Sequence, residues 1–397
     1  MVVDALIIIF VVILGLQIPS FFKFTQKDLG RLRFLWAYHL VFGYAYYSSV
    51  IAQGGSDSLK YWTEAKKITV QQALLSLVES KGTQVMYALN YIPSGILGLN
   101  FLTGTIFYSL IGFIGLIFFY KIAIELIPFN YKFNNIFLFP AILFLPNLHF
   151  WAVAVGKDTL LFFCVGAFSY ALMKWKTRIP LLIFALLLAY IVRPHIVLFL
   201  ALSYSLAFLL NNKIGKFQRV LLFLAMAGVG AIVLPSVMEY AKIEELSVDS
   251  YEQFSDNKVS VLSRAHTGSS VDVSNYPLPL KIFTFLYRPT FIDIRNFPAL
   301  LAAFENLILL ILSVMVLRRK PVKTFNEAPF VIKGLVFFLL IGTLAFSMSL
   351  GNLGIMLRMR NMFLPGMLIF ICYSYSKVVE TKIIRLNLER KLRSHTV

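Results

Sequence analysis

Charged side chains are scarce in this sequence. Asp, Glu, Lys and Arg make up 14% of the 397 residues, whereas about a quarter is usual in soluble globular domains. Such a chain has too little charge to cover a water-facing surface, while 59% of its residues are hydrophobic. The composition therefore excludes an ordinary soluble domain. It predicts an all-α protein, with residues 1–397 forming a single polytopic transmembrane domain.

Metal-ligating and redox-active residues are also few. The two cysteines, Cys164 and Cys372, both lie within apolar segments and are expected to pack as small hydrophobic side chains. The five histidines are scattered, and the sequence has no Walker motif and no dinucleotide-binding glycine pattern. We therefore expect no metal site and no cofactor. The net charge of +18 does not indicate a nucleic-acid partner, because the basic residues sit in short clusters between apolar runs.

Long apolar runs recur from one end of the chain to the other. A spanning helix needs roughly 20 apolar residues, and the sequence predicts about eleven such helices. They are expected near residues 4–22, 34–52, 102–120, 134–148, 159–173, 179–192, 196–211, 219–238, 297–317, 329–350 and 361–377. The stretch 86–99 is apolar but short, and Pro93 and Gly95 interrupt it. It is predicted to be re-entrant or interfacial.

The positions of Lys and Arg predict the orientation of the chain. Cationic loops resist translocation across the membrane, and the basic residues collect in alternate loops. These clusters lie at 23–33, 121–132, 174–178, 213–219 and 318–323, and in the tail 378–397. The N-terminus is therefore expected outside, and the basic C-terminal tail in the cytoplasm.

The opposite, extracytoplasmic face is predicted to carry most of the acidic residues. It has two long segments, 53–101 and 239–296, and tight turns near 149–158, 193–195 and 351–360. Long loops with structure of their own are usually functional. We therefore expect the chemistry of the protein on this face.

Asp57 is the first candidate catalytic residue. It follows Gly54 and Gly55, which allow a sharp turn after the second predicted span. A carboxylate near the membrane surface could serve as a general base toward a hydroxyl group. The alternative is a structural Asp that caps the next short helix.

Lys157 and Asp158 form the second candidate pair, in a polar turn between two apolar segments. They could contact substrate directly. Equally, the two side chains could pair with each other and cap the helix that follows.

The third candidate is Arg193, followed by Pro194 and His195, between two apolar helices. An Arg at the outer end of a helix can extend its head toward lipid headgroups. The positive-inside bias disfavours cations on this face, so a retained Arg needs an anionic partner, either protein or ligand.

Further arginines follow on the same face: Arg288, Arg295, Arg358 and Arg360. The planar guanidinium is suited to phosphate oxygens, so several of them together indicate a diphosphate site. Glu305 lies within a predicted span, where a carboxylate is costly unless it is paired. We expect an Arg partner such as Arg288 or Arg295, and a purely structural salt bridge is the alternative reading.

The order of these motifs resembles a known group of proteins. Gly55-Ser56-Asp57, then Phe150-Trp151 and Gly156-Lys157-Asp158, then Arg193-Pro194-His195, and finally Gly354 with Arg358-Met359-Arg360 are similar to bacterial membrane proteins of surface-polysaccharide biosynthesis. These include the O-antigen polymerases and, more distantly, the GT-C glycosyltransferases. The paired acidic form often found in the first outer loop of GT-C enzymes is not present here.

The resemblance implies glycosyl transfer from a polyprenyl-phosphate- or diphosphate-linked saccharide, outside the cytoplasm, by a protein of the bacterial inner membrane. It implies Asp57 as the catalytic base and Arg193, Arg288, Arg358 and Arg360 as phosphate-binding residues. We further predict that Lys157 and Asp158 are catalytic residues that orient the acceptor together with His195, which is also expected at the phosphate-binding site. Membrane lipids and other polysaccharide-assembly proteins would be its partners. Two alternatives remain: a transporter or flippase of lipid-linked saccharides, and a structural subunit of an envelope complex.

Overall fold

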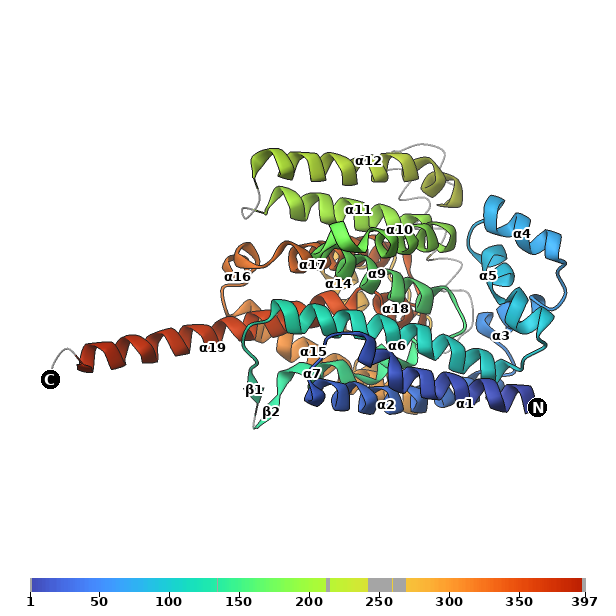
Figure 1. Cartoon of the computed structure of the whole chain (residues 1–397), viewed down its shortest axis with the longest axis horizontal. Coiled ribbons are helices and arrows are strands. Elements are labelled where there is room, and N and C mark those ends of the chain that lie inside the picture. The colour runs from blue at the N-terminus through green and yellow to red at the C-terminus, as the bar shows by residue number, and fades with distance from the viewer. Residues whose placement is uncertain (1, 134, 212–214, 242–258, 260–268, 395–397) are drawn as a thin grey trace.

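The computed structural model describes residues 2–133, 135–211, 215–241, 259 and 269–394. Much of the expected loop 239–296 lies outside the described residues. Almost all described elements are helices, which confirms the all-α class. In chain order the longer ones are α1 Val2–Gln17, α2 Gln26–Ala52, α6 Phe101–Leu126, α9 Lys157–Met173, α10 Trp175–Val192, α11 Pro194–Leu209, α12 Lys216–Ala241, α15 Phe297–Leu317, α17 Phe330–Ser349 and α19 Leu364–Ser394 (Figure 1).

Six helices of the described chain are long and apolar enough to cross a membrane. They are Val2–Phe21, Phe101–Leu126, Trp175–Val192, Lys216–Tyr240, Phe297–Leu317 and Phe330–Ser349. A seventh is added if α18 (Leu353–Arg360) and α19, which meet at 60°, form one broken span. The expected count of eleven is therefore not confirmed. Two of the expected spans, 159–173 and 196–211, are the shorter helices α9 and α11.

The predicted span 134–148 is wrong. The chain forms a small hairpin there, β1 Lys132–Phe133 and β2 Ile136–Phe137, followed by α7 Leu138–Ala141, the 3-10 turn η3 Ile142–Phe144 and α8 Pro146–Phe150. Pro140 lacks the backbone N–H that a helix interior requires, and Pro146 begins α8. The apolar run is thus broken into pieces, none longer than five residues.

Side chains from other parts of the bundle donate hydrogen bonds to the backbone of this broken segment. Irregular backbone is tolerated at membrane depth only where protein surrounds it. Tyr38 of α2 donates to the carbonyl of Phe144 at 2.9 Å, and Asn361 donates to the carbonyl of Leu148 at 3.2 Å. The buried rings of His39 and His149 meet through their Nδ1 atoms at 2.7 Å. The segment is therefore held inside the bundle without being a helix.

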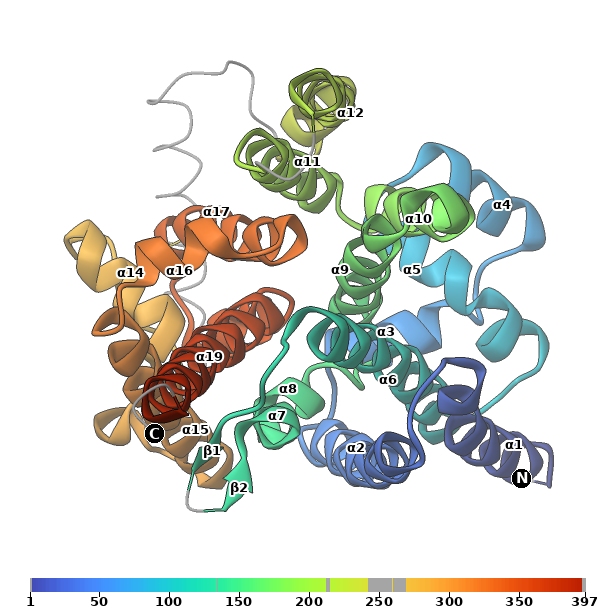
Figure 2. The same ribbon diagram turned by 60° about the vertical axis from the view of Figure 1, so that its left-hand side comes forward.

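The helices α6 and α9 form the centre of the bundle. Almost every residue of α9 is buried, and Figure 2 shows the two helices in the middle of the molecule, with α2, α10 and α19 around them. Their backbones meet where Gly115 faces Gly166: a Cβ added to Gly166 would lie 3.0 Å from the Gly115 carbonyl oxygen. Small residues allow this close approach of two helices, as is common in membranes.

The segment 53–101 is helical and lies at one end of the molecule. It comprises α3 Asp57–Glu64, α4 Val70–Glu79, α5 Thr83–Asn90 and the π-helical turn η2 Tyr91–Ile96 (Figure 1). The apolar stretch 86–99 therefore forms parts of α5 and η2 and does not make a continuous span. Asp4, near the start of α1, accepts a hydrogen bond from the Asn100 backbone at 2.8 Å, which places the start of the chain at the same end.

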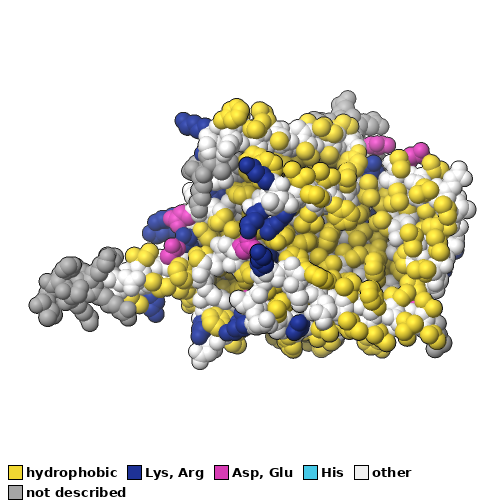
Figure 3. Space-filling model, in the orientation of Figure 1, with side chains coloured by type: hydrophobic (Ala, Val, Ile, Leu, Met, Phe, Trp, Pro, Cys, Tyr) yellow, Lys and Arg dark blue, Asp and Glu magenta, His cyan; other side chains and the backbone are white. Residues whose placement is uncertain are grey.

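The C-terminal helix α19 projects from the body at the opposite end (Figure 1). The predicted basic tail is thus a continuation of the last helix through Ser394. On the face shown in Figure 3, hydrophobic side chains cover most of the surface, while Lys and Arg gather toward the end from which α19 leaves.

Candidate functional site

A buried carboxylate at the start of α9 joins two arginines that are distant in the sequence. The side chain of Asp158 is 4% exposed and accepts a hydrogen bond from Arg193 Nη1 at 2.8 Å. Its other oxygen forms a short ion pair with Arg358 Nε. A buried charge must be paired to remain ionised, and here the two guanidinium groups lower the pKa of Asp158 although burial acts to raise it. Asp158 therefore anchors Arg193, between α10 and α11, to Arg358 on α18.

Asp57 approaches the same cluster from the segment that follows α2. Gly54, with a φ of 71°, allows the turn that leads into α3. The cap of α3 is Ser56, whose hydroxyl accepts from the Leu59 backbone at 3.2 Å, so Asp57 does not serve as the cap. The Asp57 side chain is 64% exposed, and its carboxylate lies 3.5 Å from Arg358 Nη1. The cluster thus contains one accessible carboxylate.

Lys157 lies close to these residues, but it does not pair with Asp158. Its ammonium group donates to the hydroxyl of Thr83, the first residue of α5, at 3.0 Å, and lies 5.7 Å from the ring centre of Tyr61. Burial, followed by the charge of Arg193, lowers the pKa of Lys157 to about 8. The lysine is therefore a cation near neutral pH that loses its charge in mildly alkaline solution.

These five residues form what we call the Asp158 cluster: Asp57, Lys157, Asp158, Arg193 and Arg358. Three positive groups face two negative ones, which leaves an excess of one positive charge. Among the described residues, Arg193 makes its hydrogen bonds through Nη1, and Arg358 contacts its two carboxylates through Nε and Nη1. Guanidinium N–H groups are well suited to bind the oxygens of an anion.

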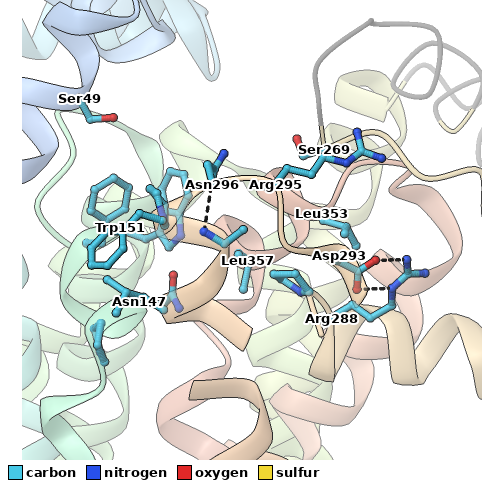
Figure 4. Close-up of a pocket in the computed structure, with 18 of the residues that line it drawn as sticks. Ser49, Asn147, Trp151, Ser269, Arg288, Asp293, Arg295, Asn296, Leu353 and Leu357 are labelled. Carbon is cyan, nitrogen blue, oxygen red and sulfur yellow. Dashed lines mark hydrogen bonds and ion pairs between the residues drawn. The ribbon is translucent and has the colours of Figure 1, made fainter. Parts of the chain in front are cut away.

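A cavity of about 570 Å³ shares the helix α18 with this cluster, although none of the five cluster residues is among the residues that line it. The helix α18 connects the two, because Leu353, Gly354 and Leu357 line the cavity and Arg358 belongs to the cluster. The walls are largely apolar and aromatic, with a few polar groups, a composition typical of ligand sites. The polar side chains of the lining are Ser49, Asn147, Ser269, Ser270, Arg288, Asp293, Arg295 and Asn296 (Figure 4).

No family model, curated protein or solved structure matches this chain. The resemblance to polysaccharide polymerases and GT-C enzymes stays a prediction. What the site can do is therefore inferred from its own geometry.

Arg288 lines the cavity but already has a carboxylate partner. It donates from Nε to Asp293 at 3.0 Å, and Figure 4 shows the two side chains joined by a pair of contacts. Burial would raise the pKa of Asp293, but the bonds from Arg288 and from the Thr290 backbone and hydroxyl lower it. Arg288 is thus part of a salt bridge in the cavity wall, outside the Asp158 cluster.

Arg360 and His195 lie apart from the cluster. The Arg360 side chain is buried and donates to the Leu286 carbonyl and, at 2.7 Å, to the side chain of Asn306. The ring of His195 packs against the rings of Phe199, Tyr240 and Phe346.

Glu305 is buried within α15 and accepts a hydrogen bond from the Asn147 backbone at 2.8 Å. Arg288, one of its two expected partners, pairs with Asp293 instead. Glu305 instead ties α15 to α8, at the wall of the cavity.

Sequence reasoning missed several residues around the cluster. Tyr46 of α2 and Ser58 of α3 share a 2.6 Å hydrogen bond, both buried, directly beside Asp57. Thr83 holds Lys157, as described above. Phe150 and Trp151 line the cavity rather than only marking a motif. Hydroxyl groups on separate helices carry no local pattern, so nothing in the sequence could indicate these partners.

Proposed function

We propose that this chain is an integral-membrane glycosyltransferase or polymerase that acts on polyprenyl-(di)phosphate-linked saccharides during surface-polysaccharide biosynthesis. One observation carries the proposal: an accessible carboxylate, Asp57, lies 3.5 Å from an arginine of a cluster with excess positive charge. A glycosyl transfer from a phosphate donor needs both elements, a base for the acceptor and cations for the leaving group.

In the proposed reaction, Asp57 accepts the proton of the acceptor hydroxyl while that oxygen bonds to the anomeric carbon of the donor sugar. The bond between this carbon and the phosphate oxygen breaks, and the phosphate leaves with the electron pair. Arg193, Arg358 and Lys157 stabilise the negative charge on the departing phosphate. No metal is part of this proposal.

The neighbouring cavity suits the rest of such a substrate. Its volume of about 570 Å³ exceeds what one sugar ring requires, and its aromatic walls with hydroxyl and amide side chains combine apolar and hydrogen-bonding surface. Phe42 and Ala45 of α2 and Phe297 and Leu301 of α15 line it from two helices, which favours entry of a lipid tail between them.

We place the cluster on the extracytoplasmic side of the bacterial inner membrane, with the C-terminus in the cytoplasm. Two features support this orientation. The basic residues visible in Figure 3 gather toward the end from which α19 leaves, in line with the positive-inside rule. The start of α1 lies near Asn100, beside the segment that carries Asp57.

Replacing Arg358 tests the role of the cations. We expect Arg358→Ala to lower glycan transfer about 100-fold or more, because a donor that stabilises developing charge is lost from a poorly hydrated site. Polymer length and amount in cells that depend on this protein, at matched membrane levels, provide the measurement. Arg318→Ala, at an exposed arginine after α15, is the control and should leave the polymer unchanged. Normal glycan length in Arg358→Ala would refute the assigned role.

The pH dependence of binding tests Lys157. Because its pKa is about 8, its positive charge is present below that pH and is lost as the pH rises through it. Affinity for a polyprenyl diphosphate should therefore fall between pH 7 and pH 9, because the cluster loses the positive charge of Lys157 over this range. Lys157→Arg, whose guanidinium stays charged, should abolish the decline. The same decline in both proteins would show that another group titrates.

A further inference from the structure

The helix α4 presents an apolar stripe that nothing in the described protein covers. Val70, Leu74, Leu75 and Val78 are between 47% and 79% exposed. The spacing of Val70, Leu74 and Val78 at every fourth position places them on one side of the helix. Only Ala73 is buried in this helix. So large an apolar fraction on an exposed ten-residue helix indicates that this surface contacts another protein or a membrane.

The helix is well defined at its start. Thr69 and Gln72 form a reciprocal capping box: the Thr69 hydroxyl accepts from the Gln72 backbone at 3.2 Å, and the Gln72 side chain accepts from the Thr69 backbone at 2.9 Å. The exposed residues Gln72 and Glu79 lie on the side of the helix opposite Leu74, whereas Gln71, which is also exposed, lies between Val78 and Leu75. The element is therefore an amphipathic helix whose apolar side faces outward.

The residues that follow α4 connect it to α10, a helix on the outside of the bundle. The Gly82 backbone donates to the carbonyl of Ile191, near the end of α10, at 3.0 Å. The ammonium group of Lys81 lies 4.4 Å from the ring centre of Tyr190 on the same helix. Only 17% of the residues of α10 are buried, and Phe184 and Leu187 are exposed. The end of α4 thus lies beside the end of α10, a helix whose exposed apolar surface its composition assigns to lipid.

Lysines flank α4 on both sides. Lys66 and Lys67 precede it, with Lys67 paired to Glu64 at 2.7 Å, and Lys81 follows it. Cations at the two ends of an apolar stripe are typical of helices that lie in the membrane interface, because they meet anionic headgroups while the stripe enters the acyl region.

We propose that α4 is an interfacial helix whose stripe of Val70, Leu74, Leu75 and Val78 is inserted into the phospholipid leaflet at the end of the molecule that carries the Asp158 cluster. The occupant of this surface is lipid. Insertion would also fix α5, since α4 packs on α5 and Thr83 at the start of α5 binds Lys157. This inference is independent of the reaction proposed above.

Spin labels on α4 test the inference. Leu74→Cys and Glu79→Cys variants would be labelled with a nitroxide, purified and placed in nanodiscs that contain phosphatidylethanolamine and phosphatidylglycerol. Both positions are exposed and lie on different sides of the helix, and the native cysteines Cys164 and Cys372 are buried. The rate at which each label collides with oxygen, which partitions into lipid, is compared with its collision rate with a water-soluble nickel chelate. The two rates show whether the label lies in the bilayer or in water.

We expect the label at Leu74 to collide several-fold more with oxygen and several-fold less with nickel than the label at Glu79. Equal nickel collision at both positions would show that the stripe faces water, which overturns the inference. Protection of the Leu74 label from both reagents would also overturn it, because protein, such as a second copy of the chain, would then cover the stripe.

Discussion

The Asp57→Asn variant is expected to fold normally and to lose glycan transfer by about 10²–10⁴-fold, the usual contribution of a general base. Asn keeps the shape of the side chain but cannot accept the proton of an acceptor hydroxyl. The fold should not suffer, because the carboxylate is 64% exposed and its ion pair with Arg358 is long, at 3.5 Å. Such a partly hydrated pair contributes little to stability.

The matching measurement uses purified protein in lipid vesicles with a synthetic lipid-linked oligosaccharide, and product length is read by mass spectrometry. Glu64→Gln is the control, since Glu64 lies in the same helix α3 but pairs with Lys67 instead of the cluster. It should retain transfer. Full activity in Asp57→Asn would remove this residue from the mechanism and leave the reaction without the base assigned here.

The Asp158→Asn variant is expected to be destabilised by about 3–5 kcal/mol, because removing one partner of a buried ion pair leaves uncompensated charge. Asp158 is 4% exposed and faces Arg193 and Arg358. Without it, the two guanidinium groups would repel each other, and α18 would lose its link to α9. We expect a lower unfolding temperature in detergent and less protein in the membrane.

Comparison of the two variants separates anchoring from catalysis. Thermal unfolding of Asp57→Asn should match that of the natural protein, while Asp158→Asn should unfold at a clearly lower temperature. An Asp158→Asn protein as stable as the natural one would mean that the arginines do not depend on this carboxylate. Asp158 would then no longer count as the structural centre of the cluster.

The sequence predicts the helical, membrane-embedded class well, because its composition and the length of its apolar runs suit helices that are surrounded by lipid. It fails at residues 134–148. The average hydrophobicity of this segment is high, but it does not take into account that Pro140 and Pro146 interrupt a helix. Nor can it show that Tyr38 and Asn361, both outside this segment, donate to the carbonyl groups exposed by the break. These partners are a property of the packed bundle.

The candidate site was predictable in part. Asp57, Lys157, Asp158, Arg193 and Arg358 all stand out as polar residues near the ends of apolar runs, and the structure brings them together. Their roles could not be assigned from sequence, because Asp158 and Arg358 are 200 residues apart. The local sequence does not show whether Asp158 pairs with its neighbour Lys157 or with two distant arginines.

Arg358 and Arg360 illustrate a second limit. The sequence predicts that both bind the phosphates of the substrate, as two arginines of one short motif. They lie on the helix α18, where two positions correspond to a rotation of about 200°. Arg358 therefore points to Asp158, while Arg360 points to Leu286 and Asn306. Without knowing that this segment is helical, the two side chains cannot be separated.

We propose that the chain itself makes glycosidic bonds on a lipid-linked substrate. The most direct test of this proposal is the natural protein alone, reconstituted in vesicles with the synthetic lipid-linked oligosaccharide and no other protein. The proposed function predicts products longer than the substrate. Movement of the substrate across the membrane without lengthening, as a flippase would cause, or no change at all, as for a structural subunit, would contradict it.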